Sequence, residues 1–202
     1  MNSSGITRIV GVPMFPLPDY YLFPGALVPL HIFEPRYRQM ISDLLDTAGR
    51  LVVGTIRAQD AQTAYGPSVF AIGGLGEIVS HRRLDDGRYL IWLLGLERVR
   101  LKEIDSDRLY RRVDATVLPD EVGNEQRNAE LAPRLRAAIE KRMLPGIELS
   151  ASLGAGLLAD ILHQHLPLSI AQKDWVLAQR NVTRRAEAAL AWLDGIADEA
   201  EA

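Results

Sequence analysis

The feature that most constrains the fold of this chain is a change of residue pattern at Pro35. Before it, the Pro-Leu steps of residues 14–33 require extended or turning backbone. Pro35 suits the first position of a helix, and the carboxylate of Glu34 favours the positive end of the helix dipole. Beyond it, apolar side chains recur with the helical period, at Tyr37, Met40, Ile41, Leu44 and Leu45. The sequence therefore predicts two strands followed by a helix over 35–48 that packs back on them.

The first half of the chain is rich in strand patterns, which we expect over 9–17, 26–33, 50–57, 69–84, 89–104 and 110–118. Pro13 and Pro16 restrict the first strand to an edge or a bulged position. The glycines within 73–76 indicate a bulge or a close approach of backbone. Asp86-Gly87, between two strand patterns, predicts a hairpin turn. The polar residues 59–68 are expected to form a surface loop.

The pattern becomes helical after a polar stretch, residues 119–124, which we interpret as a hinge region. Two apolar stripes with helical spacing follow, the first ended by Pro145-Gly146 and the second by Pro167. Ser169, with Gln three residues later, is a capping box that starts a third helix, and Asn181 can cap a fourth. We therefore expect an α+β protein with a β-rich domain over 9–118 and a helical domain over 125–202.

Composition limits the class of protein. The 202 residues are 48% hydrophobic and 24% charged, which is typical of a globular protein. The net charge of −3 gives no overall attraction to nucleic acid or to anionic lipid. Cysteine is absent, which excludes disulfides, a thiol nucleophile and cysteine-based metal sites. The N-terminus shows no signal peptide and no apolar run could span a bilayer, so we expect a cytoplasmic protein without a membrane partner; its oligomeric state is not predicted.

The sequence contains no recognisable set of catalytic residues. Gly49 and Gly54 have the spacing of a phosphate-binding loop, but Thr55 follows where that loop needs a lysine. No serine occupies the glycine-flanked position of a nucleophile elbow. We therefore expect no catalytic residues and no cofactor.

The four histidines do not form a metal site in the sequence. His163 and His165 point roughly 200° apart on a helix, so they cannot share one ion. Asp160 and His163 share a helix face, but two ligands do not make a site. His31 and His81 are far away in sequence and are expected to be half-buried residues of strands. No metal is therefore expected.

A basic strip is one of two candidate binding features, and it consists of Arg98, Arg100 and Lys102. Alternating residues of a strand share a face, so these side chains can line up to bind phosphate or an acidic peptide. The alternative is a solvated outer face that protects a sheet edge, with nearby carboxylates as partners.

The second candidate is a run of aromatic and apolar residues in an expected loop, Tyr20, Tyr21, Leu22 and Phe23. Adjacent exposed aromatic residues are unusual on a monomer, so the run is a candidate peptide-binding loop for unfolded chains. The alternative is that these side chains plug the core. The sequence leaves both open.

One long string carries a resemblance to a known family. Residues 15–40, FPLPDYYLFPGALVPLHIFEPRYRQM, are similar to the N-terminal, substrate-binding domain of Lon proteases. They resemble in particular the stand-alone bacterial proteins built from this domain, which lack the ATPase and protease modules. The similarity continues through residues 73–79, 86–88, 95–99 and 172–185.

The resemblance implies a PUA-like β-barrel followed by an α-helical bundle. It also implies a non-catalytic role in recognising unfolded or specific protein and peptide partners, with a separate protease as a further candidate partner. Two alternatives remain: an RNA-binding PUA-like protein, for which the acidic composition makes nucleic acid a poor partner, and an accessory component of ATP-dependent proteolysis.

Overall fold

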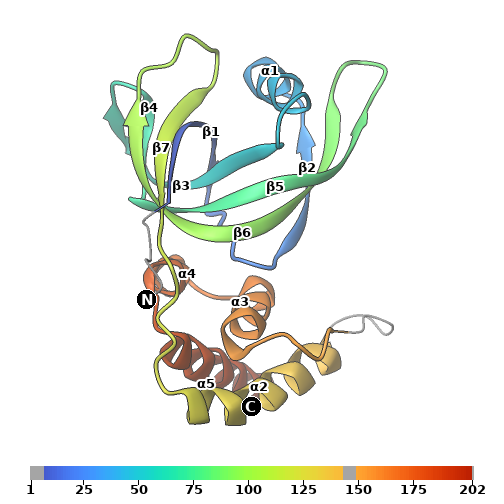
Figure 1. The fold of residues 1–202 in the computed structure, drawn as a ribbon, viewed down its shortest axis with the longest axis vertical. Helices are drawn as coiled ribbons and strands as arrows, with labels where there is room; N and C mark the ends of the chain where they lie inside the picture. The colour runs from blue at the N-terminus through green and yellow to red at the C-terminus, as the bar shows by residue number, and fades with distance from the viewer. Residues whose placement is uncertain (1–6, 143–148, 202) are drawn as a thin grey trace. The chain divides into compact units, whose positions relative to one another are not determined.

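The computed structural model describes residues 7–142 and 149–201, and the chain divides between Leu118 and Pro119 into two compact units (Figure 1). The predicted α+β class is confirmed, because strands fill the first unit and helices the second. The elements of the first unit are, in order, β1 (Arg8–Pro18), β2 (Leu27–Ile32), α1 (Pro35–Leu44), β3 (Arg50–Thr63), β4 (Gly66–Val69), β5 (Ile72–Arg83), β6 (Tyr89–Ile104) and β7 (Arg111–Val117).

Five strands of the first unit close into a barrel in the order β1-β7-β6-β5-β3. Closure comes from a parallel pairing of Met14–Pro18 in β1 with Val52–Ile56 in β3, whereas the other pairings are antiparallel. Two strands extend the barrel, β2 beside β6 and β4 beside β3. The barrel implied by the family resemblance is therefore confirmed.

Strand β1 changes partners along its length. Residues 8–14 pair with β7, and residues 14–18 pair with β3. The predicted bulge is confirmed by a register shift between Ile9 and Val12, where Gly11 has a φ of +67°. Of the two positions that the prolines allow, an edge or a bulge, the structure has the bulge, since β1 pairs on both sides. Pro16 is tolerated on this side because the β7 ladder has already ended there, whereas Pro13 lies opposite Arg112, just after the register shift.

Helix α1 covers one end of the barrel with its apolar stripe. Tyr37, Met40, Ile41 and Leu44 are buried in a core that includes Phe15, Leu22, Ile32, Leu51, Ile91 and Leu93. The helix ends at Leu44, four residues before the predicted end. Thr47 explains the early end, because both its backbone N–H and its hydroxyl donate to the carbonyl of Leu44, at 3.0 and 2.7 Å.

The expected surface loop over 59–68 is wrong. Strand β3 continues to Thr63, and β4 begins at Gly66, so this polar stretch is a hairpin. Polar residues are compatible with a hairpin at the protein surface as well as with a loop, so the composition of this stretch does not distinguish the two.

The glycine prediction is confirmed, because Gly74 on β5 lies against the backbone of the loop before β2. A Cβ at Gly74 would overlap the carbonyl oxygen of Leu22, and one at Gly95 on β6 would overlap that of Phe23. Only residues without a side chain allow the loop to cross these two strands so closely.

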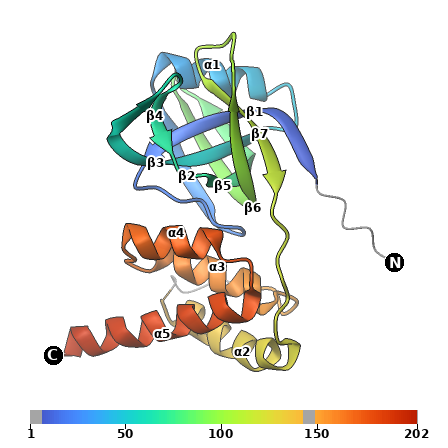
Figure 2. The same cartoon turned by 90° about the vertical axis from the view of Figure 1, so that its left-hand side faces the viewer.

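The second unit contains α2 (Glu125–Arg142), α3 (Ala155–His165), α4 (Ile170–Ala178) and α5 (Val182–Glu201), shown in yellow to red in Figure 2. Helices α2, α3 and α5 pack against one another, and α4 contacts α3. Both predicted caps are confirmed: Ser169 and Gln172 form the capping box, and Asn181 accepts from the N–H of Arg184 at 3.0 Å. Pro145-Gly146 lies outside the described residues.

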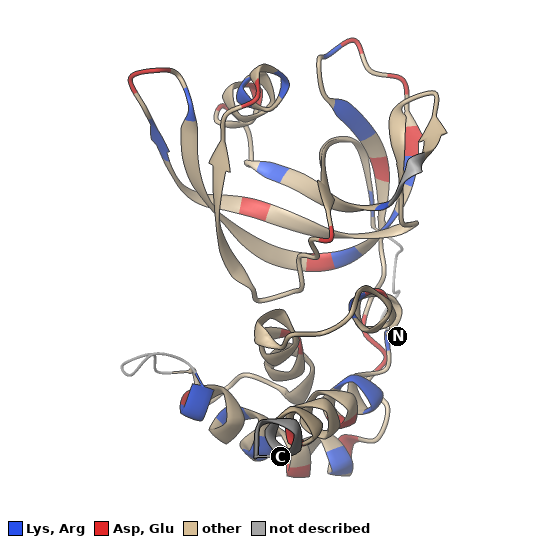
Figure 3. Cartoon of the chain, turned by 180° about the vertical axis from the view of Figure 1, so that it is seen from behind, with Lys and Arg blue, Asp and Glu red and all other residues tan. Residues whose placement is uncertain are grey.

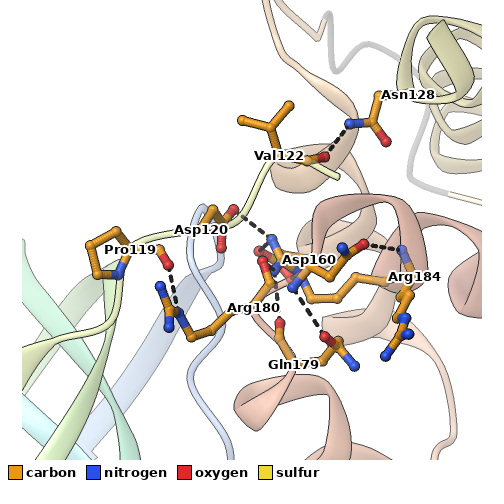
Figure 4. Close-up of polar contacts among 10 residues, drawn as sticks. Pro119, Asp120, Val122, Asn128, Asp160, Gln179, Arg180 and Arg184 are labelled. Carbon is orange, nitrogen blue, oxygen red and sulfur yellow. Dashed lines mark hydrogen bonds and ion pairs between the residues drawn. The ribbon is translucent and has the colours of Figure 1, made fainter. Parts of the chain in front are cut away.

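The stretch 119–124 is held by the helical unit. The carbonyl of Pro119 accepts from the guanidinium of Arg180 at 2.8 Å (Figure 4). Glu121 forms a β-bridge with Asn181. Leu118, by contrast, donates its N–H to the carbonyl of Arg98 in the barrel at 2.9 Å. The hinge region at 119–124 therefore stays a prediction; residues in this stretch are bonded into the second unit, and the change of bonding partner falls between Leu118 and Pro119.

A buried arginine joins four parts of the second unit. Arg185, on α5, pairs with Asp120 at 2.6 Å and with Asp160 of α3 at 3.1 Å. It also donates to the carbonyls of Gln179 and Arg180, at 2.8 and 3.0 Å. Its side chain is fully buried. These two carboxylates and two carbonyls compensate the buried guanidinium, because burying a charge without partners is energetically costly.

Candidate functional site

The aromatic run 20–23 is buried rather than exposed. Tyr21, Leu22 and Phe23 are 2%, 1% and 1% exposed, and Tyr20 is half-buried. Leu22 belongs to the main core of the barrel, and Tyr21 packs on Phe23 and Phe70 with ring centroids 6.3 and 6.2 Å apart. The expectation of an exposed contact loop is therefore wrong, and the alternative of a core plug is the one that the structure supports.

The basic strip is also not a continuous surface. Arg98 is buried, while Arg100 and Lys102 are exposed. Lys102 lies directly opposite Asp114 on β7, so its charge is balanced across the strands. Figure 3 shows acidic and basic residues interspersed on the barrel strands. The RNA-binding hypothesis depended on this strip. Because Arg98 is buried, only two of the three residues present a charge on the surface.

The histidines do not gather at one place: His163 and His165 lie on α3, whereas His31 and His81 lie on strands of the barrel unit. His163 is buried on α3, 5.5 Å from the ring of Trp192, and the nearby Asp160 is engaged with Arg185. His31 and His81 lie on strands as predicted but are exposed rather than half-buried. Within residues 7–142 and 149–201, the structure contains no group of three side chains that could hold a metal ion.

A hollow with a volume of about 820 Å³ lies in the barrel unit, beside the start of α1. It is bordered by the ends of β1 and β2, the β3–β4 turn and the β6–β7 loop. Its floor is the surface of the main core, formed by Phe15, Ile32, Tyr37 and Tyr110. Phe15 and Tyr37 meet edge to face with centroids 4.5 Å apart. We call this hollow the α1 groove.

Three large apolar side chains on the rim of the α1 groove are exposed. Phe33 precedes α1, Tyr65 lies in the β3–β4 turn and Leu109 lies in the β6–β7 loop; they are 59%, 39% and 65% exposed. They come from three separate segments and line one hollow. Clustered exposed apolar side chains are typical of interaction surfaces. The sequence analysis did not predict this cluster. The only signal was an isolated apolar residue in each of two polar segments, Tyr65 in the β3–β4 turn and Leu109 in the β6–β7 loop.

Side-chain bonds hold the segments of the rim to one another. The hydroxyl of Tyr65 donates to Asp105 at 3.1 Å and connects the two loops. The N–H of Leu109 donates to Gln39 of α1 at 3.0 Å, and the hydroxyl of Tyr110 donates to Asp43 at 3.0 Å. The rim is therefore tied to the helix, which reduces the entropy that binding would cost.

A further brace lies deeper, where Arg111 binds two segments at once. Its guanidinium makes two bonds to Glu103, at 2.9 and 2.6 Å, and a third to the carbonyl of Pro67 at 2.8 Å. The planar guanidinium suits this forked arrangement. It fixes the start of β4 beside β6 and β7.

The surroundings raise the pKa values of three tyrosines of the groove. Burial raises the pKa of Tyr37 above its usual value, and it also raises that of Tyr110, with the hydrogen bond to Asp43 acting in the same direction. The hydrogen bond to Asp105 raises the pKa of Tyr65. A tyrosine hydroxyl, with a usual pKa of about 10, is a hydrogen-bond donor near neutral pH, and these shifts move its ionisation to still higher pH.

Charges on the groove are paired within the protein. Arg36 binds Glu34 at 2.8 Å and lies over the ring of Tyr37, 4.6 Å from its centroid. Arg108 approaches Asp43 at 3.6 Å. The groove therefore combines an apolar floor and rim with locally balanced charge, which favours an apolar ligand over a strongly charged one.

No helix within the described parts of the chain is both long enough and apolar enough to cross a membrane.

Comparison with known proteins covers nearly the whole chain. A family model described as the substrate-binding domain of ATP-dependent protease La (LON) matches residues 11–195. The crystal structure of a Lon N-terminal domain protein from Xanthomonas campestris is 26% identical, with a TM-score of 0.65, over 91% of this chain and 99% of that one. The N-terminal domain of a Mycobacterium avium complex Lon protease, 22% identical over 90% and 97% of the two chains, has the same fold with a TM-score of 0.67.

Curated relatives are longer proteins. Lon protease 2 of Sorangium cellulosum is 28% identical over 89% of this chain, and Lon protease of Escherichia coli strain K12 is 22% identical over 98%. The chain spans only 24% and 26% of these two relatives, about a quarter of their length.

Proposed function

The chain belongs to the LON substrate-binding domain family, and on that premise we propose that it binds protein segments bearing large apolar side chains in the α1 groove. The observation that carries the proposal is the cluster of Phe33, Tyr65 and Leu109, exposed on three segments around an aromatic floor. Such segments are exposed in unfolded or partly folded proteins and hidden in folded ones. The groove would therefore distinguish the two by accessibility.

The energy of this binding would come from a few side chains. A few hot-spot residues near the centre of an interface each cost about 2 kcal/mol or more when truncated, and tyrosine and tryptophan are enriched among them. A ligand side chain inserted between the rim residues would remove them from water and reach the floor at Tyr37. Because the groove charges are already paired, we expect little dependence of affinity on salt.

Recognition would use side chains rather than addition of a strand to the sheet. The backbone groups of β2 at Leu27, Pro29 and His31 face away from β6, because Gly95 donates to Ala26 in the same ladder. Pro29 has no N–H to offer there, so an added strand would lose a central hydrogen bond. The groove is the better docking feature.

We further propose that the chain acts by binding and catalyses no reaction itself. The polar groups of the groove support this, since Ser106, for example, donates its hydroxyl to the carbonyl of Tyr110 at 2.9 Å and accepts from the N–H of Arg108 at 3.1 Å. The names of the curated relatives support a link to proteolysis. A separate ATP-dependent protease is therefore the proposed recipient of the bound protein.

The test uses a double variant, Phe33→Ser with Leu109→Ser, and a fluorescent unfolded probe such as reduced, carboxymethylated lactalbumin. Loss of two anchors predicts at least about a 30-fold weaker Kd in an anisotropy titration. Both side chains are exposed, so the thermal midpoint should change little.

The matched control is Val10→Ser, which removes an exposed apolar side chain on β1, and Val10 does not line the groove. We expect it to bind like the unchanged protein. Equal affinity of the double variant and the control would refute the assignment of the groove.

A further inference from the structure

A second exposed apolar surface lies on the outer face of three neighbouring strands, β2, β6 and β5. Trp92 on β6 is directly opposite Pro29 on one side and Ser80 on the other. Directly opposed residues of antiparallel strands share a face, so these positions form one row across the sheet. We call the surface centred on this row the Trp92 face.

Two further rows flank the row of Trp92. One consists of Leu27, Leu94 and Glu77, and the other of His31, Leu90 and Arg82. Val79 is the extra residue at the register shift of β5 and lies next to Ser80. The face is therefore apolar along its middle. At one end of β5 it carries Glu77, which pairs with Arg50 of β3 at 3.0 Å, and at the other end it carries Arg82.

The central residues are far more exposed than apolar residues in the middle of strands usually are. Trp92 is 46% exposed, Val79 50% and Leu27 52%. A tryptophan of this exposure at the centre of a sheet face is typical of a contact surface, since tryptophan is enriched where interfaces bury their core. The face shares no residue with the rim of the α1 groove apart from His31, which lies at its corner.

The arrangement of charge identifies the occupant. We propose that the Trp92 face binds the same face of a second copy of the chain, about a two-fold axis along the row of Trp92. Rotation about this axis exchanges the two outer rows, so Glu77 of each copy would lie over Arg82 of the other. The tryptophans would lie against each other, and Leu27 over His31. The patch is thus complementary to itself, as a two-fold interface requires.

The size of the face sets the expected strength. Three strands spaced about 4.8 Å apart and six residues of about 3.4 Å each span a patch of roughly 200–300 Å². A standard interface buries about 800 Å² per partner. The dimer should therefore be weak and reversible, with dissociation constants between about 10 µM and 1 mM.

Sedimentation velocity of the full chain over about 5 µM to 1 mM tests this, since that range covers the expected constants. The mean mass should rise with concentration from the 22.4 kDa of one chain towards twice that value. Trp92→Ser should keep the chain at 22.4 kDa throughout. A chain that stays monomeric over the whole range, or a dimer unchanged by Trp92→Ser, would overturn the proposal.

Charge reversal tests the axis itself. Arg82→Glu alone places two acids together at each end of the interface and should abolish the mass increase, as should Glu77→Lys alone. The variant carrying both changes restores opposite charges and should dimerise again. Arg100→Glu is the matched control, because Arg100 is an exposed arginine of β6 outside the face. Failure of the double reversal to restore the dimer would refute this pairing.

Discussion

The ion cluster around Arg185 permits the most quantitative prediction. The side chain is fully buried, and Asp160, its partner at 3.1 Å, is 2% exposed. Arg185→Met keeps an unbranched apolar stem but removes the guanidinium, and with it the charge, the ion pairs and the donors to two carbonyls. Loss of one partner from a buried ion pair costs about 3–5 kcal/mol, chiefly because the remaining charge stays buried.

The assay is equilibrium unfolding in urea, followed by far-UV circular dichroism and by tryptophan emission. Trp175 and Trp192 lie in the helical unit, in contact with each other, and report its unfolding. For a unit of this size, a loss of 3–5 kcal/mol lowers the thermal midpoint by more than about 10 °C. The change should appear in the helical unit, because the barrel contributes no group to the cluster.

Two companion variants separate charge from packing. Arg185→Met with Asp160→Leu removes both charges and should recover most of the lost stability, since an apolar replacement of a buried pair is often neutral. Asp120→Asn should cost less than about 1 kcal/mol, because the side chain of Asp120 is 40% exposed and screened by water. A loss below about 1 kcal/mol for Arg185→Met alone would refute the view that this cluster holds the unit together.

Further changes test the close approach in the barrel and one of its carboxylates. In Gly74→Ala, the new methyl group would overlap the carbonyl oxygen of Leu22, which should lower the free energy of unfolding by about 1–3 kcal/mol in a urea titration. The control is Gly195→Ala on α5, where the methyl group would enter open space and should raise the free energy of unfolding by about 0.5–1 kcal/mol. The hydrogen bond from Arg8 lowers the pKa of Asp114, so this carboxylate stabilises the fold above its unfolded pKa of about 3.9 and less as pH falls through its folded pKa. Asp114→Asn should therefore reduce stability at neutral pH and flatten its decline below about pH 5; an unchanged decline would contradict the assignment.

Local patterns in the sequence predict much of the fold. The strand 89–104 has the bounds that the sequence indicates, and the capping box at Ser169 starts α4. These features depend on residues close together in the chain, where period, turn and cap chemistry act directly. The apolar stripe of α1 is of the same kind.

Long-range packing decides what the sequence leaves open. Whether residues 20–23 are exposed depends on strands that lie far along the chain, where Gly74 and Gly95 allow the loop to approach. The position of Arg98, buried in an alternating charged strand, depends in the same way on distant neighbours. Composition and periodicity do not contain these contacts.

The α1 groove shows the same limit for function. Its rim residues, Phe33, Tyr65 and Leu109, are separated by more than thirty positions from one to the next. Each is unremarkable in its own segment, and only closure of the barrel brings them together. The sequence identifies the family, but the candidate binding surface emerges from the structure.

The central claim is that unfolded protein binds at the rim of the α1 groove, and site-specific photocrosslinking tests it most directly. A photoreactive benzoyl group is placed at Phe33 in one sample and at Val10, exposed on β1, in another. Irradiation with the unfolded probe should join the probe to the first sample and leave the second uncoupled. Equal coupling at both positions, or none at Phe33 while the probe is bound, would contradict the account.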